Sequence, residues 1–244
     1  MLRVLGFHKI QRFSLGGTWN TPGQIETFFQ TLQASGFDLV SLKQLVRDPL
    51  KIINDNDFHI MITFDDGDCG LYRYLLPIIR RSYLPVTVFI ITGYIGENQS
   101  WDIFSSSRHL NWDEIYELKD AGFEFGSHSV HHYDLTRLGL DEVKKELSES
   151  KRLIEERLGE CLGVVYPFDR VNERVVKTAR EVGYRVGFGS KEIIPLSLRR
   201  ERIFRTDNLK SFKVKIQPEE SLLLRWERFK AKVINLFSMA AMKR

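Results

Sequence analysis

The sequence has little cysteine, no long hydrophobic run and no apparent leader. Cys69 and Cys161 are the only cysteines among 244 residues, which is too few for a disulfide framework, so an oxidising compartment is not indicated. The longest apolar run, near LPVTVFIIT, is well short of the roughly 18 residues that span a bilayer. The opening MLRVLGFHKIQRF is too short and too polar for a signal peptide. These features predict a cytoplasmic location.

Over most of the chain there is also no excess of positive charge. The net charge is +4, but residues 221–244 contain six Lys or Arg and one Glu, so residues 1–220 carry a net charge of −1. A body without excess positive charge argues against a nucleic-acid groove, so no nucleic-acid partner is expected.

Apolar residues, in contrast, are plentiful and regularly spaced. Hydrophobic residues make up 43% of the chain, with 17 Phe among them, which is enough for one full-sized core. Strand-like and helix-like segments alternate, as in βα units around a parallel sheet. The expected strands are 2–8, 37–41, 58–64, 85–91, 123–128, 161–168 and 184–189, and the expected helices are 21–37, 72–83, 111–122, 140–159, 172–183 and 221–237.

This alternation predicts an α/β fold, a single-domain distorted (β/α) barrel of about seven strands over residues 1–218. Residues 219–244 would follow as a basic amphipathic helix. In barrels of this kind the chemistry gathers at the carboxyl ends of the strands.

Two segments at such strand ends contain residues that are suited to chemistry. Asp65 and Asp66 follow the apolar run at 58–64, and His128 and His132 follow the strand at 123–128. Two imidazoles four residues apart and one carboxylate form a common zinc set with an open position for water. The second carboxylate could then act as a base. The alternatives are a solvated turn or helix cap for the aspartates and surface positions for the histidines.

The same residues lie in motifs that resemble a known family. TFDDG at 63–67, HSVHH at 128–132 and VVYPFD at 164–169 resemble three motifs of the polysaccharide deacetylase family, the NodB homology domain of carbohydrate esterase family 4. The resemblance covers roughly residues 1–190. It implies a NodB-like barrel and a divalent metal, with zinc preferred. The implied reaction removes the N-acetyl group from an N-acetylated sugar of a glycan or lipid-linked precursor.

The resemblance also assigns roles. Asp65 matches the catalytic base, and Asp66, His128 and His132 match the metal ligands. Phe168 matches the aromatic residue whose backbone N–H helps to hold the oxyanion. His131 falls at a variable position and is not assigned to the metal.

Three departures from the family pattern stand out. Val165 occupies the place of an arginine that orients the base, Asp169 replaces a closing glycine, and no histidine follows His132 to act as the late general acid. His8, in VLGFHKI, resembles the N-terminal histidine that serves as the acid in a circularly permuted branch. The alternative for His8 is a structural histidine at a strand end.

Several residues keep open alternatives. Trp101, Tyr133 and Asp169 are candidates for a substrate cleft, although the aromatic residues could equally pack in the core. The helix at 221–237 could pack on the barrel or lie on an anionic membrane surface as a peripheral contact. Two rival functions also remain: a metal-dependent amidohydrolase acting on a non-sugar amide, and a non-catalytic glycan-binding protein.

Overall fold

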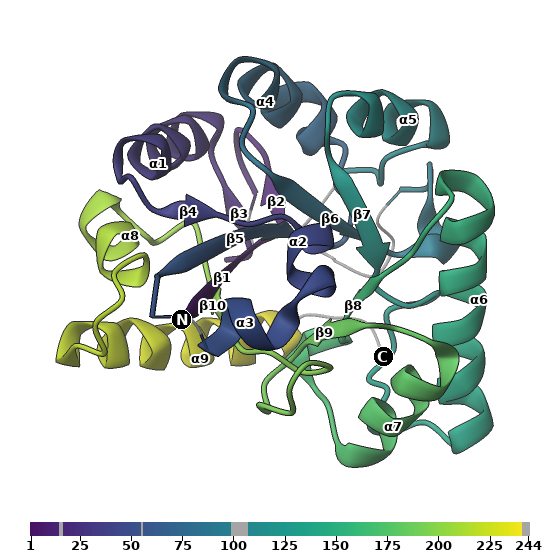
Figure 1. Ribbon diagram of the computed structural model, residues 1–244. Helices are drawn as coiled ribbons and strands as arrows, with labels where there is room; N and C mark the ends of the chain where they lie inside the picture. Colours follow the sequence, from purple (N-terminus) through teal and green to yellow (C-terminus); the bar gives the residue numbers. More distant parts are fainter. Residues whose placement is uncertain (15–16, 55, 99–106, 241–244) are drawn as a thin grey trace.

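The protein is a nearly closed barrel of parallel strands surrounded by helices (Figure 1). The computed structural model describes residues 1–14, 17–54, 56–98 and 107–240. Seven strands follow one another in the order β10-β1-β5-β6-β7-β8-β9, and the short β4 pairs with the start of β5. The strands are β1 (Leu2–Phe7), β4 (Asp38–Leu39), β5 (His59–Phe64), β6 (Val86–Ile90), β7 (Glu124–Ser127), β8 (Gly163–Val165), β9 (Val186–Phe188) and β10 (Arg200–Arg202), with a separate pair β2 (Lys9–Ile10) and β3 (Trp19–Asn20).

The ends of the sheet nearly meet just before β10. Leu198 forms a parallel bridge with Phe188 of β9. Its backbone N–H donates to the carbonyl of Gly187 at 2.8 Å, and its carbonyl accepts from the N–H of Gly189 at 3.0 Å. The predicted seven-strand α/β barrel is therefore confirmed.

The seventh barrel strand is not the one that the sequence predicts. The segment at 37–41 forms only the two-residue β4, whereas the unpredicted β10 pairs with β1 in the barrel. The sequence of β10, Arg-Glu-Arg, has no apolar pattern that would mark a strand. It is held by pairing with β1 and by ion pairs to its charged side chains.

Most of the helices cover the outside of the sheet, whereas α2 packs against its inner face (Figure 1). The helices are α1 (Pro22–Ala34), α2 (Leu42–Arg47), α3 (Pro49–Asn54), α4 (Leu76–Ser82), α5 (Trp112–Asp120), α6 (Leu140–Leu158), α7 (Glu173–Val182), α8 (Leu209–Lys215) and α9 (Leu222–Ala240). Most begin and end at the signals that the sequence carries. Thr21 and Asn111 form capping boxes, and Gly159 and Gly183 end their helices with φ of 91° and 95°.

Two apolar clusters lie on opposite faces of the strands. The larger joins alternate strand residues such as Leu5 and Ile62 to the covering helices. The smaller joins residues of the inner face, including Val4, Met61 and Phe89, to α2. Burial on both faces explains why all six residues of β5 are buried. Because both faces are largely apolar, most of the polar side chains that could take part in chemistry lie at the strand ends.

Within the described part of the chain, no helix is both long enough and apolar enough to cross a membrane. The division of the chain near residue 218 stays a prediction, although α9 itself is present.

Candidate active site

The residues that the sequence singles out converge at the carboxyl ends of the strands. His8 follows β1, Asp65 and Asp66 follow β5, His128 follows β7, and Phe168 lies in the short helical turn after β8. In a parallel barrel these ends share one edge, so residues far apart in sequence become neighbours.

The backbone at this edge is unusual. Among the described residues, six that are not glycine have positive φ, and all but Tyr83 lie at these strand ends: Asp66, Ser129, His132, Phe168 and Asp169, with φ between 56° and 67°. The left-handed region is unfavourable for residues with a Cβ, and such strain gathers at functional sites. The clustering of these strained residues indicates that the functional site lies at this edge of the barrel.

Asp66, His128 and His132 form a cluster that fits a metal ion. One ligand atom from each residue lies within 4.8 Å of the others. Asp66 Oδ1 is 3.5 Å from His128 Nε2 and 3.8 Å from His132 Nε2. His128 Nδ1 lies 2.8 Å from the carbonyl oxygen of Val165. Because a carbonyl oxygen can only accept a hydrogen bond, Nδ1 carries the proton and donates. The other ring nitrogen, Nε2, therefore keeps its lone pair for a metal. Burial lowers the pKa of both imidazoles, which favours the neutral form that binds metals.

A residue that the sequence did not indicate supports this cluster from behind. The imidazole of His109 donates from Nδ1 to the backbone carbonyl of Asp66 at 2.8 Å. Burial lowers the pKa of His109 to about 4, so the ring is neutral. It holds the left-handed peptide that directs the Asp66 side chain. Nothing in the sequence near His109 signals this role, because the contact bridges 43 positions.

Asp65 lies beside the cluster and is fully buried. The Nη1 of Arg200 donates to its Oδ1 at 2.7 Å, and its Oδ2 lies 3.7 Å from Nε2 of His8. Among the described residues, Oδ2 has no hydrogen-bond partner. Burial would raise the pKa of Asp65, but the positive charge of Arg200 and the nearby histidines outweigh it and hold the pKa below its ordinary value. Asp65 is therefore an ionised carboxylate with one oxygen available.

Arg200 and Arg202 are two further residues that sequence reasoning missed. Arg200 also donates from Nη2 to Asp169 at 2.6 Å, and Arg202 donates from Nε to the other oxygen of Asp169 at 2.6 Å. Burial opposes the charge of Asp169, but the two guanidinium groups prevail and hold its pKa well below the ordinary range. Asp169 thus stands where a glycine was expected and anchors two arginines from β10.

The remaining predicted residues lie around this centre. The ring of Phe168 packs edge-on against His132, with 4.7 Å between ring centroids. Tyr133 is half exposed, and its ring stacks on His131. His131 is bound by Glu146 at 2.6 Å and does not belong to the three-residue cluster. Trp101 lies outside the described residues. Burial lowers the pKa of His8, although Asp65 and Asp66 oppose the shift.

Comparisons with known proteins agree with the motifs. A family model described as "Polysaccharide deacetylase" matches residues 53–187, more than half of the chain. Bacillus subtilis YxkH, which is named for the polysaccharide deacetylases, is 25% identical over 188 residues, or 76% of this chain and 63% of that protein. A poly-beta-1,6-N-acetyl-D-glucosamine N-deacetylase of Staphylococcus aureus is 25% identical over 143 residues, or 54% of this chain and 48% of that protein. The chain thus spans less than two-thirds of the length of either relative.

Solved structures share the fold. The deacetylase PplD of Streptococcus pyogenes superimposes with a TM-score of 0.76 at 22% identity, covering 89% of this chain and 98% of that one. IcaB from Ammonifex degensii gives a TM-score of 0.72 at 18% identity, covering 88% and 95%. These likenesses extend over nearly the whole barrel.

Proposed function

Because this chain belongs to the polysaccharide deacetylase family, we propose that it is a metal-dependent enzyme that removes the N-acetyl group from an N-acetylated sugar of a glycan or lipid-linked glycan precursor. The observation that carries the proposal is the position of Asp65. This buried carboxylate lies between Arg200 and His8 and directly precedes Asp66 of the three-residue cluster. The Staphylococcus aureus relative, a poly-beta-1,6-N-acetyl-D-glucosamine N-deacetylase, supports an N-acetylglucosamine polymer as the substrate class.

The donor set supports a divalent metal held by Asp66, His128 and His132. Two imidazoles and one carboxylate with an open position are typical of catalytic zinc, although cobalt or nickel would also suit these ligands. A bound divalent ion would supply a water of lowered pKa and would polarise the acetamide carbonyl.

The residues of the chain account for the proton transfers. Asp65 is the general base that accepts a proton from the attacking water, and Arg200 keeps it ionised and oriented. The backbone N–H of Phe168 donates to the oxyanion of the tetrahedral intermediate. His8 protonates the amine as the C–N bond breaks, which gives acetate and a free amino sugar. His8 would thereby take the part of the absent late histidine, as in the family branch with an N-terminal acid.

One structural feature weakens the rival non-catalytic function. That alternative rested on the missing arginine and the missing late histidine. Arg200 reaches the base from β10, and His8 lies 3.7 Å from the same carboxylate. A protein that only bound glycans would have no need to hold a buried carboxylate between two such groups.

Acetate release tests the proposal. The purified protein is incubated with β-1,6-linked N-acetylglucosamine oligomers, with lipid-linked N-acetyl sugars and with non-sugar acetamides, with and without a chelator, and its metal content is measured. Release from sugars alone, abolished by the chelator, supports the proposed function. Release from non-sugar amides alone would favour the amidohydrolase. Bound metal without release from any substrate, in a protein that binds the oligomers, would favour the glycan-binding alternative.

A further inference from the structure

The C-terminal helix α9 is attached to the barrel by charged side chains. Arg228 donates from Nε to Glu201 of β10 at 2.7 Å and from Nη1 to Glu220 at 2.6 Å. Glu227 is buried and lies 4.0 Å from the ammonium of Lys215 on α8. A helix on the surface of a soluble domain usually turns its apolar side to the core and its charges to water. Between residues 222 and 234, α9 instead turns Glu227 and Arg228, beside the fully buried Leu224, toward the barrel and leaves most of its apolar residues exposed.

The apolar stripe of α9 faces outward. Leu222 is 81% exposed, Trp226 57%, Phe229 55% and Val233 38%. The rings of Trp226 and Phe229 stack with 5.7 Å between centroids, which makes one continuous aromatic surface. At about 100° per residue these four positions fall within an arc of about 60°, on the side of the helix opposite Leu224. Figure 1 shows α9, in yellow, at the periphery of the molecule.

Basic residues border the stripe on both sides. By the same helical spacing, Arg225 and Lys232 follow one border and Lys230 the other. Arg225 and Lys232 are exposed. Lys230, in contrast, donates a hydrogen bond to Glu227 at 2.7 Å. An exposed apolar stripe with cations along its edges is complementary to a surface that offers acyl chains below a layer of negative charge.

We propose that α9 is an interfacial helix that docks this protein on an anionic lipid surface, with Trp226 and Phe229 inserted at the headgroup level and Arg225 and Lys232 paired with lipid phosphates. A second copy of the chain is the less suitable occupant, since packing two such stripes face to face would bring both rows of cations together. The inference does not depend on the deacetylase chemistry.

Docking through α9 leaves the candidate active site uncovered. Glu201, which binds Arg228, also binds Arg3 at 3.0 Å, and Arg3 lies near the amino end of β1. The active-site residues lie at the opposite, carboxyl ends of the strands. The helix α9 therefore contacts the barrel near the amino ends of its strands.

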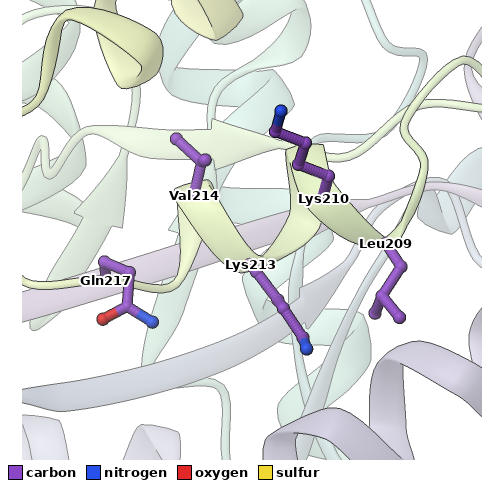
Figure 2. Close-up of a pocket in the computed structure, with 5 residues that line it drawn as sticks. All are labelled: Leu209, Lys210, Lys213, Val214 and Gln217. Atoms are coloured by element: carbon purple, nitrogen blue, oxygen red, sulfur yellow. The ribbon is translucent and has the colours of Figure 1, made fainter.

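A surface pocket on the adjacent α8 does not add to this surface. It is lined by Leu209, Lys210, Lys213, Val214 and Gln217 (Figure 2). Figure 2 shows that Lys210 and Lys213 extend in different directions, so their ammonium groups do not converge on one anion. We assign no ligand to this pocket.

Vesicle binding tests the proposal. The full chain is mixed with vesicles of phosphatidylcholine alone or with one-third phosphatidylglycerol, and binding is measured by flotation and by tryptophan emission. We expect tight binding to the anionic vesicles only, a blue shift in emission, and weakening as salt concentration rises. Equal binding to both vesicles, or none to either, would overturn the proposal.

Two variant pairs separate the apolar and the charged contributions. Trp226→Ser/Phe229→Ser and Arg225→Gln/Lys232→Gln alter exposed side chains, so each should keep the thermal midpoint of the parent while weakening anionic vesicle binding about tenfold or more. The matched controls are Tyr83→Ser, at an exposed aromatic residue that ends α4, and Lys144→Gln/Lys145→Gln on α6, neither of which should change binding. Light scattering tests the alternative, self-association. If the parent protein is a dimer that Trp226→Ser/Phe229→Ser dissociates, and if it does not bind vesicles, the stripe is a self-association surface.

Discussion

The guanidinium of Arg200 donates to the carboxylate of Asp65 at 2.7 Å, although 135 positions separate the two residues. The pairing brings a fixed positive charge to a buried carboxylate beside the cluster of Asp66, His128 and His132, and the Oδ2 of this carboxylate has no hydrogen-bond partner among the described residues. It also explains how a chain with valine at the expected arginine position can still keep Asp65, the proposed base, ionised.

Replacing Arg200 with glutamine should therefore change both the rate and its pH dependence. Without the guanidinium the pKa of Asp65 rises, because burial is then less opposed, so the acidic limb of the pH–rate profile moves to higher pH. We expect kcat to fall by about 100-fold. The exposed neighbour Arg199 provides the control, and Arg199→Gln should leave the profile unchanged. An unshifted acidic limb in a folded Arg200→Gln variant would separate Arg200 from the base.

The aspartate pair should divide cleanly by substitution. Asp65→Asn removes the base but no metal ligand, so metal content should stay at the parent level while acetate release falls by about 1000-fold or more. Asp66→Asn should lose both metal and activity. Metal analysis and acetate assays on the two variants check this. Normal turnover by Asp65→Asn would remove Asp65 from the mechanism.

His8 should matter only where the leaving group needs a proton. His8→Ala should reduce deacetylation of N-acetyl sugars by about 100-fold. Hydrolysis of 4-nitrophenyl acetate should be much less affected, because its phenolate leaves without protonation. His59→Ala is the control, since His59 begins β5 at the far end of the barrel. Equal losses on both substrates would indicate that His8 is structural.

Metal removal should destabilise the protein. Saturating metal at about 100 times its dissociation constant stabilises the fold by about 2.7 kcal/mol, or about 5 to 10 °C in thermal midpoint for a chain of this size. His128→Ala should abolish the difference between metal-loaded and chelator-treated protein. His131→Ala should retain it, because His131 binds Glu146 and not the cluster. A full midpoint difference in His128→Ala would contradict the ligand assignment.

Asp169 should contribute stability that depends on pH. Its pKa is lowered in the folded state, so its ion pairs stabilise the fold fully above its unfolded pKa of about 4, and the contribution disappears as pH falls toward the lower folded value. We expect Asp169→Asn to cost about 3 kcal/mol near neutral pH. The difference from the parent should shrink below about pH 4 in denaturant titrations. The exposed Asp120→Asn is the control, and a pH-independent difference would refute the linkage.

The parts of this protein that depend on local sequence pattern could be predicted before its structure was known. Buried β-branched runs and capped helices predicted the alternating α/β barrel, since their periodicity is a property of neighbouring residues. The pairs Asp65–Asp66 and His128–His132 could be recognised as candidate site residues for the same reason. Their spacing alone suggested ligands and a base at two strand ends, and the structure brings them together.

The charged groups that contact these residues from other strands could be identified only in the folded chain. β10 has no apolar pattern, so the sequence does not predict this strand. The contacts of its Arg200 with Asp65 and Asp169, and of its Arg202 with Asp169, could not be predicted either. His109 supports Asp66 from 43 positions away. The helical spacing of α9 was visible in the sequence, but its apolar stripe could have faced either way. The ion pair of Arg228 with Glu201 of β10 turns that stripe outward, because the buried carboxylate of Glu201 needs a charged partner and lies on the barrel.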